Sequence, residues 1–387
     1  SPSLDASESV VSKDWYRLLG VSAHKSFLED LPSAHTGYFA PILPDIAGDP
    51  AYRFALHADG IGTKGVLAYL WWKETGDTSV WQHLAQDALV MNTDDLACSG
   101  ITGPFVFSTT LIRNPFYIPD EVVKTIIQAV YAFAEQLRAW GIPAKVAGGE
   151  TADMPDLVRT IGLEATAAAR VPANHLIPLR RPDKEIAIIG LASFGQAQYE
   201  KEYNSGIGCN GITAARHLLL DASYKDKYPE AVEPSLVGSY QGTLRLSDEV
   251  ESVAVGKLLL SPSRTYLPIL REKYRRYLYG IIHCTGGGQR KAIKYFPKTL
   301  IRKDNLFPLP PVFRLLEGKR PWAELFETFN MGHRLELYVA SEAAEELMEI
   351  SRAYQVEAQR IGTAIPIEEE TRIEIQFQGQ EWVWSAH

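Results

Sequence analysis

Strand-like and helix-like segments alternate along this chain, and the alternation limits its fold more than any other feature of the sequence. Residues 52–58 and 159–170 have the apolar spacing of strands, whereas residues 80–98 and 121–140 have the spacing of helices. An almost fully apolar strand, EIAIIGL, restarts the pattern at residue 185. Such a pattern is expected when helices cover sheets, so we predict an α/β (α+β) fold.

The length of the chain predicts more than one domain. Its 387 residues exceed the usual size of a single core, and a polar segment rich in arginine, with three prolines, lies at 172–184 between the two series of elements. We therefore predict a flexible tail over residues 1–15, an N-terminal domain over 16–175 and a C-terminal domain over 176–387.

The composition excludes several classes of protein. The chain is 46% hydrophobic and 22% charged, as in an ordinary globular protein, and its net charge of -8 argues against a nucleic-acid partner. No segment has the run of about 18 apolar residues that a membrane span needs. The three cysteines, Cys98, Cys209 and Cys284, form no CxxC pair, so we expect neither disulfides nor structural zinc in a reduced, cytoplasmic protein.

The stretch HADGIGTK at residues 57–64 has the residue types of a phosphate-binding loop but not the spacing of a Walker A motif. Asp59 follows an apolar strand, where a carboxylate can meet a metal ion. Gly60 and Gly62 allow backbone amides to approach a ligand, and Lys64 adds a positive charge. The alternative interpretation is a tight turn with a solvated lysine.

Two further stretches add carboxylates at the ends of predicted elements. MNTDDLACSG places Asp94 and Asp95 near the C-terminus of a helix, where negative charge opposes the helix dipole and a magnesium ion would relieve the repulsion. GGETADMP places Glu150 after two glycines at a predicted strand end, with Asp153 three residues on. The alternatives are solvated acids at the first stretch and a helix start at Thr151 in the second.

A glycine turn, HCTGGGQRK, is predicted to open a helix. Its amides at 286–288 and the basic residues Arg290 and Lys291 fit an anion such as phosphate, against the alternative of a closely packed turn. His283 stands beside this turn as a candidate proton carrier, although a lone histidine more often has a structural role.

Six motifs in this order resemble those of the aminoimidazole ribonucleotide synthetases, also called phosphoribosylformylglycinamidine cyclo-ligases: DGIGTK, the DDL pair, GGETADMP, SPSRTY, HCTGGG and LFETFNMG. The resemblance runs from about residue 16 to about residue 366. It implies a homodimer whose N-terminal mixed sheet, with helices, forms a dimeric barrel, followed by a C-terminal α/β domain. It also implies an ATP- and magnesium-dependent ring closure of formylglycinamidine ribonucleotide, with release of ADP and phosphate.

The resemblance implies roles for the residues at the matching positions. The catalytic residues are Asp59, Lys64, Asp95 and His283. The metal ligands are Asp59, Asp94, Asp95 and Glu150. The residues around ATP are Gly60, Gly62, Thr63, Lys64, Gly149, Glu150 and Thr151. The residues around the substrate are Asn210, Gly211, Thr285, Gly286, Gly287 and Gly288.

The sequence also departs from the pattern of these enzymes. A glycine-rich stretch that precedes the first strand in the family is replaced by SAHTGYFAPILPD, with the single glycine Gly37. The asparagine before the second aspartate is Asp94 here, and His333 and Arg334 replace small residues in FNMGHR.

A compact loop containing a histidine is replaced in this chain by the longer SFGQAQYEKEYNSGIGCNG. The candidates for the lost histidine's role are Tyr199, Tyr203 and Asn204. These departures keep two alternatives open: a noncatalytic nucleotide-binding paralogue, and another phosphotransferase of the superfamily such as thiamine monophosphate kinase.

Overall fold

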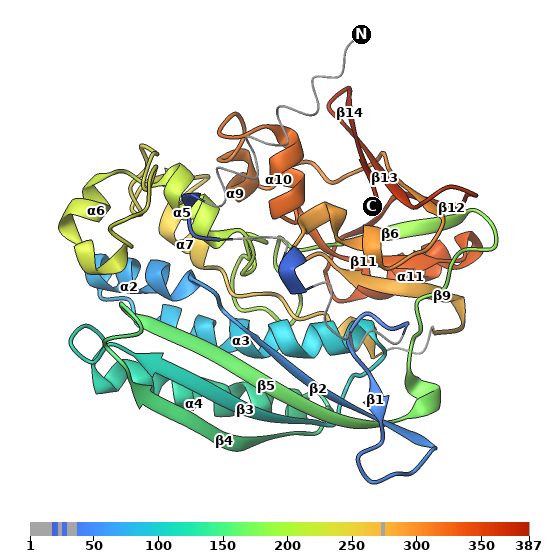
Figure 1. The fold of residues 1–387 in the computed structure, drawn as a ribbon, viewed down its shortest axis with the longest axis horizontal. Coiled ribbons are helices and arrows are strands. Elements are labelled where there is room, and N and C mark those ends of the chain that lie inside the picture. Colours follow the sequence, from blue (N-terminus) through green and yellow to red (C-terminus); the bar gives the residue numbers. More distant parts are fainter. Residues whose placement is uncertain (1–17, 22–24, 29–36, 272–274, 387) are drawn as a thin grey trace.

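The computed structural model describes residues 18–21, 25–28, 37–271 and 275–386 (Figure 1). The predicted tail over 1–15 and the first four residues of SAHTGYFAPILPD lie outside these ranges. The described chain forms two layered units, each built on one large sheet, with α3 running between them (Figure 1).

The first unit contains a five-stranded mixed sheet in the order β1-β2-β5-β3-β4. Its strands are β1 (Leu43–Pro44), β2 (Tyr52–Gly60), β3 (Phe105–Arg113), β4 (Ala144–Asp153) and β5 (Ile161–Pro172). The helices of this unit are α2 (Lys64–Thr75), α3 (Ser79–Cys98) and α4 (Asp120–Ala139). Only β3 and β4 pair in parallel; the other neighbours are antiparallel.

One face of this sheet is buried under α3 and α4. Along β3, Phe105, Phe107 and Leu111 are buried and alternate with exposed residues, because successive side chains of a strand point to opposite faces. On the other face Leu56 and Val106 are 58% and 44% exposed. The described strands form an open sheet and no closed barrel, so the predicted dimeric barrel requires a second copy of the chain.

The second unit contains a seven-stranded sheet in the order β14-β13-β10-β12-β6-β11-β9. Its strands are β6 (Ile186–Ala192), β9 (Leu278–His283), β10 (Thr299–Lys303), β11 (His333–Val339), β12 (Ala358–Pro366), β13 (Arg372–Phe377) and β14 (Gln380–Ser385). A separate pair consists of β7 (Glu249–Val250) and β8 (Val253–Ala254). Every residue of β6, β9 and β11 is buried, which explains why EIAIIGL lacks the alternation of a half-exposed strand.

Short helices surround the second sheet. The α-helices are α5 (Ile212–Leu219), α6 (Ser223–Lys227), α7 (Val255–Leu260), α8 (Leu267–Leu270), α9 (Pro311–Arg314), α10 (Trp322–Thr328) and α11 (Ala344–Ala353). The 3-10 helices of the chain are η1 (Ser26–Leu28), η2 (Ala173–His175), η3 (Pro229–Ala231), η4 (Arg275–Tyr277), η5 (Gly288–Lys294) and η6 (Ser341–Ala343). Among the residues that the structure describes, no helix combines the length and apolar character needed to cross a membrane.

The α/β prediction is confirmed, with two local corrections. The strand in GGETADMP does not end before Glu150 but continues as β4 to Asp153, so the alternative of a helix start at Thr151 was wrong. Eight residue pairs with β3 hold this segment extended. The triple-glycine turn opens the 3-10 helix η5 rather than an α-helix.

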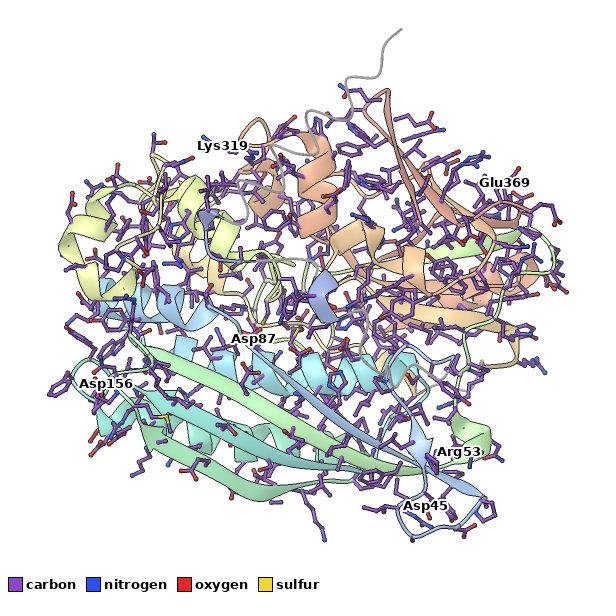
Figure 2. All side chains as sticks on the ribbon, viewed as in Figure 1. Asp45, Arg53, Asp87, Asp156, Lys319 and Glu369 are labelled. Atoms are coloured by element: carbon purple, nitrogen blue, oxygen red, sulfur yellow. The ribbon has the colours of Figure 1, made fainter. Side chains whose placement is uncertain are left out.

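The two units share one continuous hydrophobic core. Buried polar contacts also cross between them, and Asp87 of α3 is an example: it accepts hydrogen bonds from the backbone and hydroxyl of Ser263 at 2.7 Å each (Figure 2). The functional residues at this boundary are therefore held by both sheets.

Candidate active site at the junction of the two units

The centre of the site is the carboxylate of Asp95, which lies between two imidazoles. His57 Nε2 is 3.1 Å from Asp95 Oδ2, and His283 Nδ1 is 2.8 Å from Asp95 Oδ1. His57 comes from β2, Asp95 from α3 and His283 from β9, so both units contribute. On its other side, His57 Nδ1 is 2.8 Å from the side-chain oxygen of Asn92, one helical turn before Asp95.

Asp59 lies beside His57 and Asp95, because the side chains of β2 alternate between the two faces of the sheet. His57 and Asp59 are two residues apart and point to the same face, towards α3. One ligand atom from each of His57, Asp59 and Asp95 lies within 4.8 Å of the others. Asp59 Oδ1 also accepts the backbone N–H of Gly60 at 2.8 Å.

The surroundings shift the pKa values of Asp59 and Asp95 in opposite directions. Burial, followed by the nearby charge of Asp95, raises the pKa of Asp59. Burial would also raise the pKa of Asp95, but hydrogen bonds from His283 and His57 outweigh it and hold that pKa far below its usual range. Asp95 is therefore an anion, and a nearby cation would favour the ionised form of Asp59.

Arg334 fixes the protonation state of His283. The Nε–H of Arg334 donates to His283 Nε2 at 3.0 Å, so this nitrogen must be the acceptor and Nδ1 must carry the proton that is donated to Asp95. Burial lowers the pKa of His283, which keeps the ring neutral. The role of His283 as a proton carrier stays a prediction, and the contact with Arg334 does not support it.

The Asp59–Asp95 pair fits a hard divalent cation. Magnesium prefers oxygen ligands and is often held by one or two carboxylates together with substrate phosphates. Burial first, and the charge of Asp95 second, raise the pKa of Asp59, and a bound cation would oppose both effects. These two residues would hold the ion.

Asp94 faces away from this group. Successive residues of a helix point about 100° apart, and Asp94 is fully buried against the second unit. Its oxygens accept the hydroxyl of Thr265 at 2.8 Å and the backbone N–H of Tyr266 at 2.7 Å. The structure thus gives Asp94 a place in packing and does not bring it to the other predicted metal ligands.

Glu150 is likewise separate from the Asp59–Asp95 pair. The register places Gly60, Glu164, Thr110 and Glu150 in one row across the sheet, on the same face. Asp59 points to the opposite face. Glu150 and its neighbours Gly149 and Thr151 are exposed on the edge strand β4.

Lys64 does not point to an open site. Its buried ammonium contacts Asp87 Oδ2 at 3.0 Å and donates to the carbonyl oxygens of Gly208 at 3.0 Å and Ser261 at 2.6 Å. An ammonium group has three N–H donors, and these partners use them all. The predicted contact of Lys64 with phosphate stays a prediction that this geometry does not support.

Lys291 is a lysine whose charge does act on the two carboxylates. Its charge acts to lower the pKa of both Asp59 and Asp95, and its Nζ contacts the Thr285 hydroxyl. The ammonium also lies 5.2 Å from the centre of the Phe39 ring. The basic residues of HCTGGGQRK therefore bring positive charge to the acidic site.

The predicted substrate residues meet the HADGIGTK loop. A Cβ atom on Gly286 would lie 3.8 Å from Asn210 Nδ2, and the buried Asn210 Oδ1 has no partner in the described chain. Thr63 Oγ1 is 2.6 Å from Thr213 Oγ1 at the start of α5. Gly211 precedes α5 with a φ of 82°, a conformation that favours glycine.

The turn after His283 is held by close packing as well as by its conformation. Gly287 has a φ of 96° and Gly288 a φ of 54°, and a Cβ on Gly288 would lie 2.4 Å from the carbonyl oxygen of Phe326. Both interpretations of the turn, close packing and ligand approach, are therefore compatible with the structure.

Which of the three candidates takes the role of the lost histidine stays a prediction. Tyr199 donates its hydroxyl to the carbonyl of Thr265 at 2.6 Å, and Asn204 donates to Glu200 of its own loop and to the carbonyl of Pro262 between α7 and α8. Tyr203 is 37% exposed.

Sequence reasoning missed the roles of His57 and Asn92. His57 could have been found, because it lies two residues before Asp59 on a strand. Asn92 could not, because only the packing of α3 against β2 brings its side chain to His57.

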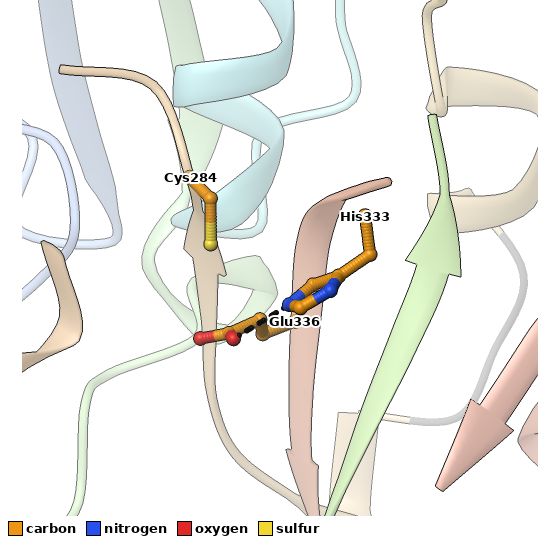
Figure 3. Close-up of side chains that lie close together, drawn as sticks. All are labelled: Cys284, His333 and Glu336. Atoms are coloured by element: carbon orange, nitrogen blue, oxygen red, sulfur yellow. Dashed lines mark hydrogen bonds and ion pairs between the residues drawn. The ribbon is translucent and has the colours of Figure 1, made fainter. Parts of the chain in front are cut away.

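A second cluster, Cys284, His333 and Glu336, has metal-binding residue types but a structural arrangement (Figure 3). His333 Nε2 is 2.9 Å from Glu336 Oε2, and Lys303 Nζ is 2.6 Å from the same oxygen. The other oxygen accepts the Tyr338 hydroxyl at 2.9 Å. The carboxylate is thus already neutralised by a buried ammonium, and the cluster needs no metal ion.

Comparison with known proteins places the chain in a family. Residues 43–171 match the AIR synthase related protein, N-terminal domain, and residues 186–374 match the C-terminal domain of the same family. A phosphoribosylformylglycinamidine cyclo-ligase of Pyrococcus furiosus is 30% identical over 81% of this chain and 79% of its own length. One of Methanococcus vannielii is 28% identical over 84% and 81%.

Solved structures show the same fold at low sequence identity. Thermotoga maritima PurL complexed with FGAR has a TM-score of 0.54 and 16% identity, covering 98% of this chain. The same protein complexed with ATP has a TM-score of 0.51 and 14% identity, covering 97%. This chain spans about half of PurL, 52% and 50% in the two structures. The domain matches and the archaeal relatives together show that the chain belongs to the AIR synthase, or phosphoribosylformylglycinamidine cyclo-ligase, family.

Proposed function

We propose that this protein closes the imidazole ring of aminoimidazole ribonucleotide in purine biosynthesis. It would convert formylglycinamidine ribonucleotide and ATP into aminoimidazole ribonucleotide, ADP and phosphate. The observation that carries the proposal is the Asp59–Asp95 pair, held by His57 and His283 beside the glycine turn where both units meet. The names of the archaeal relatives support the same reaction.

In the proposed reaction the γ-phosphoryl group of ATP passes to the formyl oxygen of the substrate. The neighbouring nitrogen then attacks the activated carbon, the C–O bond breaks and phosphate leaves. Such a reaction asks the protein mainly for positioning and charge neutralisation. Lys291 would reduce the negative charge around the phosphates, and the unpaired Asn210 oxygen would accept a donor from the substrate.

ATP and magnesium are the proposed cofactors. Asp59 and Asp95 would hold the ion, which when bound supplies positive charge against the triphosphate. The two imidazole contacts keep Asp95 in place and ionised, because they hold its pKa low. The PurL complexes with FGAR and ATP support a ribonucleotide substrate and a nucleotide cofactor.

A cytoplasmic homodimer is part of the proposal. The open face of the first sheet exposes Leu56 and Val106, and exposed apolar patches commonly mark contact sites. Two such faces packed together would form the barrel that the family resemblance implies.

The test uses purified protein with formylglycinamidine ribonucleotide, ATP and magnesium. We expect ADP and an aminoimidazole product in equal amounts, each dependent on both substrates. If thiamine monophosphate supports ADP formation and this substrate does not, the chain is a kinase of the superfamily.

A noncatalytic paralogue is the second candidate, and two observations favour it. Both oxygens of Asp95 are already occupied by imidazoles, and Lys64 has no free donor. Tight ATP binding without ADP formation would support this candidate and refute the ring closure.

A further inference from the structure

The longer loop that replaces the family's histidine loop forms one wall of a cavity outside the proposed active site. Residues 199–204 close over the groove between α3 and α4 and leave a cavity of about 420 Å³. Gln82, His83 and Gln86 line it from α3. By helix periodicity these residues lie on the opposite side of α3 from Asn92 and Asp95. The volume is within the range of small-molecule sites, roughly 300–1,000 Å³.

Aromatic rings provide part of the lining. Trp140, directly after α4, and Tyr199 of the loop lie edge to face, with ring centres 5.4 Å apart. Phe133 is buried at the floor, next to the small side chains of Ala129 and Ala132. A flat ring could enter over these small residues and contact Trp140.

Carboxamide groups provide the polar part. Within the described chain, the side chains of Gln82, Gln128 and Gln136 have no hydrogen-bond partner, although all three line the cavity. Gln86 donates its Nε2 to the carbonyl of Ser263 at 2.9 Å, which leaves its oxygen available. Each carboxamide offers a donor and an acceptor side by side.

The charged side chains that line the cavity nearly balance. Glu200 is paired with the buried Arg264, Nε to Oε1 at 3.0 Å. Glu202 Oε1 lies 3.5 Å from His83 Nε2, and burial lowers the pKa of His83, so the imidazole does not neutralise this carboxylate. Lys201 of the loop also lines the cavity, and its positive charge offsets the negative charge of Glu202.

We propose that this cavity binds a neutral heteroaromatic base or its nucleoside, at a site separate from the proposed nucleotide site. Glutamine carboxamides pair with the donor–acceptor edge of a purine such as adenine, and aromatic side chains stack on any base. Because Lys201 and Glu202 offset one another, the lining carries little net charge and suits a neutral ligand.

The test is calorimetric titration of the full chain with adenosine, and with AMP for comparison. A non-hydrolysable ATP analogue is present at saturation, so that the proposed nucleotide site is already filled. We expect adenosine to bind at least as tightly as AMP, because the lining offers the phosphate no net positive charge. Trp140→Ala should weaken adenosine binding by about 10-fold or more, because a stacked base contributes substantially to binding.

Two further variants keep the test independent of folding defects. Gln136 is exposed, so Gln136→Ala should leave thermal unfolding unchanged while weakening the binding of adenosine several-fold. Glu202→Gln should strengthen the binding of AMP relative to the binding of adenosine. The matched controls, Tyr131→Ala on α4 and Gln380→Ala on β14, lie outside the cavity and should bind adenosine normally.

The proposal is overturned if millimolar adenosine gives no binding, or if Trp140→Ala and Gln136→Ala both bind adenosine as the parent protein does. It is also overturned if AMP binds more tightly than adenosine. Because binding is measured directly, these outcomes do not depend on whether the chain catalyses ring closure.

Discussion

Replacing Lys64 by methionine should destabilise the fold strongly. The Lys64 ammonium and the Asp87 carboxylate are both fully buried and 3.0 Å apart. Removing the ammonium leaves Asp87 without a cationic partner among the described residues, with donors from Ser263, and it leaves the carbonyl groups of Gly208 and Ser261 without this donor. A buried charge without its partner is costly, because the interior solvates it poorly.

The expected loss follows from these contacts. Breaking a buried ion pair by removing one partner costs about 3–5 kcal/mol, which is a large part of the roughly 5–15 kcal/mol that stabilises a typical domain. The double variant Lys64→Met/Asp87→Leu removes both charges. It should therefore lose less than the sum of the two single variants, by at least about 1 kcal/mol.

The assay is urea unfolding followed by fluorescence and circular dichroism, with ATP turnover measured on the same samples. Lys73→Met is the matched control, because Lys73 is exposed on the same helix and should change stability by no more than about 0.5 kcal/mol. If Lys64→Met keeps its unfolding midpoint and loses only turnover, Lys64 is a phosphate ligand and our structural reasoning is refuted.

Four further expectations can be checked directly. Asp95→Asn should lower turnover by about 100-fold and also lower stability, because the carboxylate accepts hydrogen bonds from both imidazoles. Asp94→Asn should lower stability without a comparable loss of turnover, because Asp94 is a packing residue. Chelation with EDTA should abolish turnover and magnesium should restore it; activity retained in EDTA would remove the metal from the mechanism. Burial lowers the pKa of His217 to about 3 in the folded protein, whereas an unfolded histidine has a pKa of about 6.5. Between these two values the unfolded state binds more protons, so the stability of the fold should fall as the pH drops from 6.5 towards 3. His217→Gln should flatten this dependence in acid titrations. Leu56→Glu should convert a dimer into monomers in light scattering, and a monomeric parent protein would contradict the proposed barrel.

Much of the fold could be predicted because local patterns carry it. β2, β5, α3, α4 and β6 all overlap the segments whose apolar spacing or composition predicted them. Their periodicity records which face of an element is buried, and this information is present in the order of the residues.

The candidate site could be predicted only in part. Asp59 and Asp95 were identified from their motifs, and the structure brings them together. Glu150 does not lie with them, because the strand continues past GGET as β4. Asp94 does not lie with them either, because helical geometry turns its side chain towards the second unit. Lys64 has the residue type of a phosphate ligand, yet its partners come from positions that no local motif reveals.

The sequence by itself determined the family, the alternation of sheets and helices, and the acidic glycine turn that carries Asp59. Only the tertiary structure decided which lysine acts on the carboxylates. The charge of Lys291 lowers the pKa of Asp59, whereas Lys64 is buried against Asp87. The reason is physical. A residue's secondary structure depends largely on neighbours close in the chain, but the charge and hydrogen-bond state of a buried group depends on partners that the fold brings from distant elements.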